Sequence, residues 1–213
     1  MPEKPLDHQI HLGDPRALRA YAHPTRMALV GLLRTEGPFT ATRAAELTGE
    51  SVASCSYHLR ILAKYGLVEE AEPGAPGREK PWRATASYTD WPAWSADPAV
   101  ADAAGALSTA VAEVQFNRLM RARELRHTLP AQWQRAETYS DVTLYLTPEE
   151  LSELGGRIDE VIAEYARRDQ DPKDRPPTAR RVTYLHTGYV APGQPAPPAE
   201  AAPGPAPEQQ EEP

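Results

Sequence analysis

Apolar residues recur every three or four positions along several stretches of the first half of the chain, and each such stretch predicts a helix. Asp14-Pro15 is a cap followed by a proline suited to a first helical turn, and a short helix is expected from there to Tyr21. A second helix is expected over residues 24–37, closed at Gly37-Pro38. Thr40 can cap a third helix, which Gly49 ends.

The same spacing continues in residues 51–68 and divides the next helix into two faces. One face is an apolar stripe of Val52, Cys55, Leu59 and Leu62. The opposite face is formed by Ala53, Tyr57, Arg60 and Lys64, with Ser54 and Ser56 on the flanks. The helix should end at Tyr65-Gly66. Taken alone, this pattern also fits a solvated surface helix.

The neighbouring segments favour a more specific interpretation. Two short helices joined by a glycine-containing turn, the second with a polar and basic outer face, make a helix-turn-helix. Two strand-like runs follow, LVEEAE and PWRATA, and they flank the tip PGAPGREK, which carries Arg78 and Lys80. Helices followed by such a basic hairpin predict a winged helix.

These motifs carry a family resemblance. HPTRMALVGLL, the run ATRAAELTGESVASCSYHLRILAKYGLVEE and the wing GREKPWRAT together resemble the ArsR-like winged-helix transcription regulators of bacteria, over about residues 14–90. In that family a Ser-x-His-Leu-x-x-Leu run marks the recognition helix, here Ser56, His58, Leu59 and Leu62. The resemblance implies DNA binding and dimerisation through helices that flank the winged helix.

A DNA-binding surface follows from the outward positions of these elements. Ser54, Tyr57 and Arg60 are expected near base edges. His58 falls at the edge of the apolar stripe, so bracing the helix or reaching a phosphate suits it better than reading bases. The complete predicted DNA-binding set is Thr40, Thr42, Arg43, Ser51, Ser54, Ser56, Tyr57, His58, Arg60, Lys64, Arg78 and Lys80.

A long helix is expected after Asp97-Pro98, to about Arg126. Its apolar residues keep a 4, 3, 4, 3 spacing, and they form a narrow seam of Val100, Ala104, Leu107, Val111 and Val114. At Arg118 the seam is interrupted, and Phe116, Leu119 and Met120 take over. Such a seam can pack on its own domain or pair with a second copy, and the family resemblance favours the homodimer.

Residues 129–190 read as a strand-helix-strand unit. Residues 141–146 alternate as a strand, Thr147 and Glu150 make a capping box, and Leu151, Leu154, Ile158, Val161 and Tyr165 follow at helical spacing; residues 179–190 read as the second strand. The unit could supply dimer surface. Alternatively, Trp133, Tyr145, Tyr165 and Tyr184 could line a pocket for a small-molecule effector.

Charge and composition refine this organisation. Residues 191–213 hold eight of the 23 prolines and four glutamates but no lysine or arginine, so a disordered acidic tail is expected. Residues 1–86 carry 11 Lys and Arg against 10 Asp and Glu, so the net charge of -7 does not exclude DNA. The chain lacks a long apolar run and a signal-peptide pattern, which predicts a cytoplasmic protein without a membrane partner.

Little in the chain favours catalysis or metal binding. Cys55 is the single cysteine and lies on the apolar stripe, and neither a nucleophile elbow nor a phosphate-binding loop is present. His8 and His11 are spaced by three residues within a proline-flanked leader, which is weak support for a metal site. No catalytic residue, metal ligand or cofactor is therefore predicted.

The sequence as a whole predicts an α+β protein with five parts. They are a flexible leader (1–12), a winged helix-turn-helix domain (13–96), a dimerisation helix (97–128), the appended α+β unit (129–190) and the tail (191–213). The predicted function is a regulator that binds double-stranded operator DNA as a homodimer. The alternative is a winged helix that serves only as a protein-interaction module.

Overall fold

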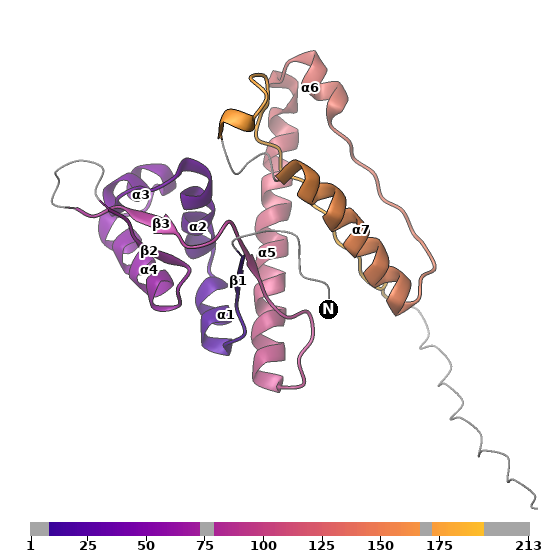
Figure 1. Ribbon diagram of the computed structural model, residues 1–213, viewed down its shortest axis with the longest axis horizontal. Helices are drawn as coiled ribbons and strands as arrows, with labels where there is room; N and C mark the ends of the chain where they lie inside the picture. The colour runs from indigo at the N-terminus through magenta and orange to yellow at the C-terminus, as the bar shows by residue number, and fades with distance from the viewer. Residues whose placement is uncertain (1–8, 73–78, 167–171, 194–213) are drawn as a thin grey trace, which may run out of the picture. The chain divides into compact units, whose positions relative to one another are not determined.

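Helices dominate the chain, and short strands accompany them in its first half. The computed structural model describes residues 9–72, 79–166 and 172–193, and Figure 1 shows the order of the elements. The chain divides into two units, residues 1–181 and residues 182–213. The first-half elements are β1 (Gln9–His11), α1 (Pro15–Tyr21), α2 (Pro24–Glu36), α3 (Ala41–Thr48), α4 (Val52–Lys64), β2 (Val68–Glu70), β3 (Trp82–Ala84) and β4 (Tyr88–Asp90).

The three helices α2, α3 and α4 form the helix-turn-helix, and their ends lie where the sequence predicts them. Thr40 caps α3 by accepting a hydrogen bond from the Arg43 amide, and Ser51 caps α4 in the same way. Gly49 has a φ of 77°, a left-handed conformation that glycine adopts without steric cost, and it makes the tight turn between α3 and α4.

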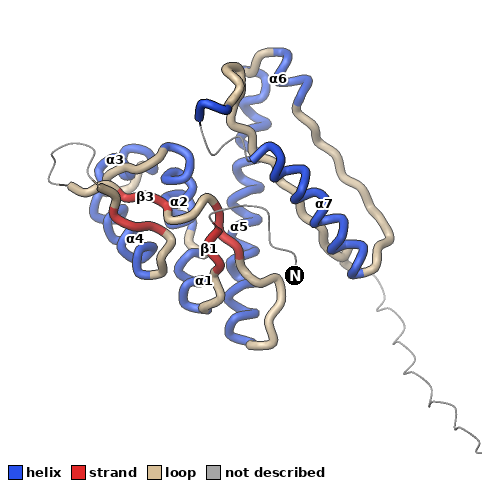
Figure 2. The backbone as a smooth tube through the Cα atoms, in the orientation of Figure 1, coloured by secondary structure: helices blue, strands red, loops and turns tan. Residues whose placement is uncertain are grey.

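The wing is the antiparallel pair β2 and β3, in which Val68 lies opposite Ala84 and Glu70 opposite Trp82. Phe39 extends this sheet, because its backbone exchanges hydrogen bonds with Trp82 at 3.1 and 2.8 Å. Figure 2 shows β3 beside the helix-turn-helix. The predicted α+β class and winged helix-turn-helix are therefore confirmed. The wing tip, residues 73–78, lies outside the described residues.

A second strand pair differs from the prediction. Residues 1–12 were expected to form a flexible leader, but β1 pairs in parallel with β4, with Gln9 opposite Tyr88. The imidazole Nδ1 of His11 lies 3.0 Å from a carboxylate oxygen of Asp90, and Leu12 is buried. Nothing local to residues 9–12 indicates this pairing, because the partner strand lies 79 residues further along the chain.

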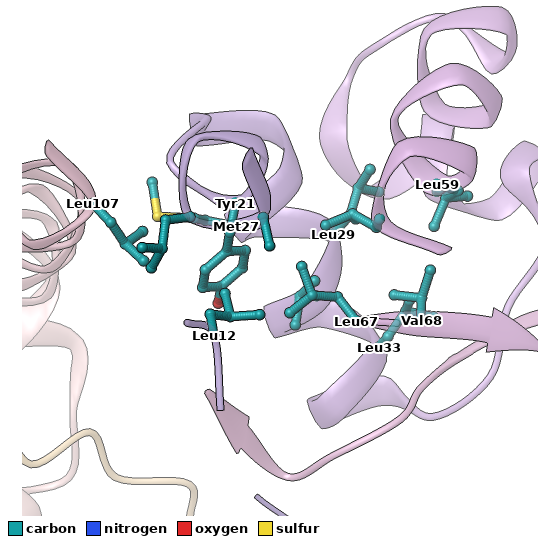
Figure 3. Packing of buried hydrophobic residues seen from close by; sticks show 14 of the residues in the cluster. Leu12, Tyr21, Met27, Leu29, Leu33, Leu59, Leu67, Val68 and Leu107 are labelled. Carbon is teal, nitrogen blue, oxygen red and sulfur yellow. The ribbon is translucent and has the colours of Figure 1, made fainter. Parts of the chain in front are cut away.

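One hydrophobic core unites these elements with the long helix α5 (Pro98–Leu125). Figure 3 shows Leu107 of α5 beside Met27 and Tyr21, with Leu29, Leu33, Leu59 and Leu67 continuing the same cluster. Asp97 caps α5 as predicted, accepting a hydrogen bond from the Ala99 amide at 2.8 Å. The recognition helix and the long helix are thus held on one packed body.

The elements after α5 are η1 (Arg126–Thr128), α6 (Ala131–Ala136), α7 (Pro148–Ala166) and η3 (Pro172–Asp174). The capping box of α7 is confirmed, because Thr147 and Glu150 exchange hydrogen bonds of 2.8 and 3.2 Å. The two strands predicted to flank it are wrong, since residues 141–146 and 179–190 form no strand. The appended unit is therefore a capped helix between extended segments.

The second unit is described from residue 182 to residue 193, and no helix or strand occurs in that range. Val182, Tyr184 and Leu185 are all more than half exposed there. Of the predicted disordered tail, the part from residue 194 onward lies outside the described residues.

Candidate nucleic-acid interface

Helix α4 separates its two faces as the sequence predicts. Cys55, Leu59 and Leu62 are fully buried, whereas Tyr57 is 60% exposed on the opposite side. Arg60 and Lys64 share the outward face and are exposed. Two leucines and a cysteine anchor the inner face of α4, and its outer face is polar and cationic, so α4 is suited to contact an anionic surface.

One member of the predicted apolar stripe is wrong. Val52 is 44% exposed, because it is the first residue of α4 and lies at the edge of the core. At the same end, the Ser51 hydroxyl accepts the Ser54 amide at 3.1 Å, so Ser51 holds its own helix. Ser54 and Ser56 are half-buried on the two flanks.

His58 faces inward and is only 9% exposed, so it is not part of the outward surface. Its ring centroid lies 4.7 Å from that of His23, and its Nδ1 lies 3.4 Å from Nη1 of Arg26. Burial lowers the pKa of both histidines, and the positive charge of Arg26 lowers it further. Of the two roles expected for His58, the structure fits the one that braces α4 against α2.

The beginning of α3 brings the predicted phosphate contacts next to acidic side chains. The Thr42 amide and hydroxyl donate hydrogen bonds to the Glu79 carboxylate at 3.2 and 2.8 Å. Arg43 forms an ion pair of 2.6 Å with Glu46. Thr40 accepts the Arg43 amide at 3.3 Å as the helix cap. The Glu79 carboxylate thus occupies the position at the start of α3 where backbone amides could donate hydrogen bonds to a phosphate oxygen.

The described part of the wing pairs its cations with glutamates. Lys80 lies 2.9 Å from Glu70, and Arg83 lies 2.7 Å from Glu69. The hydrogen bond with Glu70 raises the pKa of Lys80, so this amine stays charged at neutral pH. Both pairs are exposed and therefore open to exchange with a stronger anion. Arg78 lies outside the described residues.

The predicted dimerisation seam of α5 lies against the chain's own core. Ala104 and Leu107 are buried among residues of the winged-helix cluster, and Val100, Val111 and Val114 are half-buried on the same cluster. Helix α1 packs on this side of α5, which accounts for the burial. Further along, Phe116 and Met120 are 59% and 45% exposed and lie one helical turn apart.

Most of the four aromatic residues predicted to line an effector pocket are exposed. Tyr145, Tyr165 and Tyr184 are 93%, 62% and 67% exposed, so none of them is enclosed. Trp133 is half-buried, and the Arg180 guanidinium lies 5.7 Å from its ring. Their grouping in the sequence analysis assumed a packed strand-helix-strand unit, and the strands are absent.

Metal ligands and the single cysteine bear on possible chemistry. Among the described residues, no group of three or more His, Cys, Asp or Glu side chains is placed to hold a metal ion. Cys55 is buried, with its sulfur 3.6 Å from the Thr48 hydroxyl. Within the same described ranges, no helix has the length and hydropathy needed to cross a membrane.

Sequence reasoning missed two residues of this surface. Glu79 follows the wing tip and looked like one more solvated charge, yet it contacts α3, which lies 37 residues earlier. Arg26 lies beneath the recognition helix, and its distance in sequence from His58 left no local signal. Phe116 and Met120 did carry a signal, because their spacing interrupts the seam.

Comparisons with known proteins agree with this architecture. A family described as a helix-turn-helix domain matches residues 21–71, and this match confirms the predicted helix-turn-helix over that segment. No curated protein matches the chain in sequence.

Among solved structures, the chain is similar to the homodimeric winged helix-turn-helix DNA-binding domain of Mb0332 from Mycobacterium bovis, a possible ArsR-family transcriptional regulator. The identity is 21%, the match covers 47% of this chain and 76% of that one, and the TM-score is 0.31. A double mutant of Lactococcus lactis ZitR is 17% identical, with 66% and 75% of the two chains covered and a TM-score of 0.30. The apo form of that mutant is 17% identical, with 66% and 83% covered and a TM-score of 0.31.

Proposed function

We propose that this winged helix-turn-helix protein is a transcription regulator that binds double-stranded DNA in a sequence-specific manner as a homodimer. The observation that carries the proposal is the two-sided α4: fully buried Cys55, Leu59 and Leu62 anchor it, and Tyr57 and Arg60 project outward. A helix held in this way can enter the major groove without rearranging its core. The role needs no catalytic residue and no cofactor.

Within this proposal the side chains divide into two kinds of contact. Ser54, Tyr57 and Arg60 lie on the part of α4 that would face base edges, where an arginine can donate two hydrogen bonds to a guanine. Thr42, Arg43 and Lys64 are exposed and suited to phosphates, as is Ser56 on the flank of α4. Lys80 would contact the DNA backbone from the wing by exchanging Glu70 for a phosphate.

The homodimer contact belongs to the second half of α5 in this proposal. The first half is already covered by α1, whereas Phe116 and Met120 expose a hydrophobic pair on one face. A Phe116→Glu change should give a monomer in sedimentation, and a Phe116→Leu change should remain dimeric. A parent protein that is monomeric at every concentration would contradict this part of the proposal.

A second function has one observation in its favour. The wing cations Lys80 and Arg83 are paired with Glu70 and Glu69, so the wing's described part offers little net positive charge to DNA. A winged helix with such a neutral wing could instead bind another protein. The two functions differ sharply in their dependence on salt, because DNA binding releases counterions and binding to a neutral protein surface does not.

The test is a titration of the full chain with duplex DNA, first of random sequence and then selected from bound genomic fragments. Affinity should fall steeply between low and moderate salt. Arg60→Ala should weaken binding to the selected duplex by about 1 to 3 kcal/mol, and its melting temperature should match the parent's. Arg121→Ala, an exposed arginine on α5, is the matched control. Absence of salt-dependent binding would favour the protein-interaction module.

A further inference from the structure

A groove on the winged helix lies away from the outward face of α4. It has a volume of about 430 Å³, and its lining comes from α2, α3, the turn before α4 and the second half of α5. The apolar part of the lining is Pro24, Ala28, Leu32 and Leu47. Small-molecule sites in proteins have volumes of roughly 300 to 1,000 Å³ and combine apolar walls with a few polar groups, so this groove has a suitable size.

Two threonines, Thr25 and Thr48, and two opposite charges complete the lining. Arg118 comes from α5 and Glu50 from the turn that leads into α4. Gly31 lies under the arginine: a Cβ at this position would be 3.5 Å from Nη2 of Arg118, so a longer side chain there would displace the guanidinium. The sequence carries the same signal, since Arg118 interrupts the apolar spacing of α5.

Arg118 differs from the arginines of the chain that have a carboxylate partner. Arg43, Arg83, Arg126 and Arg181 each have a carboxylate partner within 3.2 Å. Arg118 has no ion pair within the described ranges, although it lies beside an apolar surface. A guanidinium presents a planar fork of donors that matches a carboxylate. The Arg118 side chain is exposed, so it is open to a ligand that lies in the groove.

We propose that this groove binds a small organic carboxylate with an apolar body. The carboxylate pairs with Arg118, and the apolar body lies on Ala28, Leu32 and Leu47. Glu50 sets the selectivity, because its negative charge repels a second carboxylate at the other part of the groove. Monocarboxylates with an aromatic or short aliphatic body are therefore accepted, and dicarboxylates are rejected.

The position of the groove also gives the ligand a role, and this step rests on the proposed DNA binding. The groove joins α5, which carries the proposed dimer contact, to the turn that begins α4. The ligand contacts Arg118 of α5 with its carboxylate and contacts α2 and α3 with its apolar body. It thereby fixes the angle between α5 and the recognition helix α4. Linkage then requires the ligand to bind free and DNA-bound protein with different affinities.

The first experiment measures ligand binding without DNA. Phenylacetate, indole-3-acetate and octanoate are titrated into the full-length protein by calorimetry and by NMR, with phenylacetamide as the uncharged control. The three carboxylates should bind saturably and the amide should bind at least about tenfold more weakly, since it lacks the charge for Arg118. Arg118→Gln should lower carboxylate affinity by about tenfold, and Arg121→Gln should leave it unchanged.

A second variant tests the selectivity. Benzene-1,4-diacetate should bind the parent poorly, and Glu50→Gln should improve its binding while leaving phenylacetate binding within about twofold. The proposal is overturned if none of the three carboxylates binds, if the amide binds as well as phenylacetate, or if Arg118→Gln binds all probes like the parent. If Glu50→Gln binds benzene-1,4-diacetate as poorly as the parent does, the role of Glu50 in selectivity is wrong.

The DNA arm is separate, so the two proposals can fail independently. If phenylacetate binds and the protein has no affinity for any duplex, the carboxylate site stands and the regulator function is wrong. If the protein binds DNA and phenylacetate binds without changing that affinity, the site stands and the coupling is wrong. If phenylacetate shifts the affinity of the parent for its operator and this shift disappears in Arg118→Gln, the result supports both the carboxylate site and its coupling to DNA binding.

Discussion

Residues 9–125 and residues 137–190 both contain apolar residues at regular spacing, but among the described residues the first region buries far more of them. In α4 the helical spacing places Leu59 and Leu62 in a continuous core. In α7 the same spacing leaves Leu154, Val161 and Tyr165 at 36%, 56% and 62% exposure. Periodicity therefore shows which residues share a face of a helix. It does not show what covers that face, because the cover comes from elements distant in sequence.

The largest expected effect separates these two regions by stability. Leu59 is fully buried among α4, α2 and the wing, so Leu59→Ala should reduce the free energy of unfolding by about 2 to 5 kcal/mol. Leu144 is 53% exposed, and Leu144→Ala should change the free energy of unfolding by less than about 0.5 kcal/mol. Chemical denaturation followed by circular dichroism measures both. A large loss for Leu144→Ala would show that the second region packs as firmly as the first.

The comparison also explains what could be predicted from the sequence. The caps at Asp14, Thr40, Asp97 and Thr147 were predicted correctly, because a cap depends on residues within one turn of the helix. The two faces of α4 were predicted for the same reason.

Failures came from contacts made over long distances. A strand needs a partner strand, so the alternation of residues 141–146 was not enough to form one. Conversely, β1 exists because β4 pairs with it across 79 residues. The contact of Glu79 with Thr42 and the inward position of His58 likewise depend on how separate elements meet. These parts of the candidate site could be found only in the folded chain.

Acid should lower the stability of the first region, residues 9–125. The effect should be smaller than that of Leu59→Ala. The pKa of His58 is lowered in the folded protein by burial and by Arg26, and Glu50 opposes this in part. The unfolded chain therefore binds protons more readily, and stability that is present above the ordinary pKa of 6.5 is lost as pH falls through the lower folded value. His23 adds to the same trend.

Melting temperatures between pH 7.5 and about pH 5 measure this trend. His58→Gln should flatten the decline, because it removes one of the two buried titrating groups. His127→Gln is the control, since His127 is exposed on η1. Parallel curves for the parent and His58→Gln would show that this histidine does not carry the acid sensitivity.

A smaller effect is expected at the contact between the wing and α3. The Glu79 carboxylate accepts the Thr42 amide and hydroxyl, at a helix start where a DNA phosphate could bind. Glu79→Gln should tighten binding to all duplexes by about two- to fivefold, because a charge that competes with phosphate is removed. Glu72→Gln makes the same change in net charge at an exposed residue just after β2. Equal gains in the two variants would mean that overall charge, rather than the Thr42 contact, limits affinity.

The most local effect concerns two helix caps of the same kind in the two regions. Ser51 caps α4 inside the packed region, and Ser51→Ala should lower global stability by about 1 kcal/mol. Thr147 and Glu150 cap α7, which buries only Ala163. A 19-residue helix with so little packing depends on its own caps, since most of the stability of a helix in a protein comes from tertiary packing. Thr147→Ala should therefore reduce the circular dichroism signal at 222 nm before unfolding and leave the melting temperature of the winged helix unchanged. If Thr147→Ala lowers that melting temperature as much as Ser51→Ala does, α7 unfolds together with the winged helix, and the two regions form one cooperative unit.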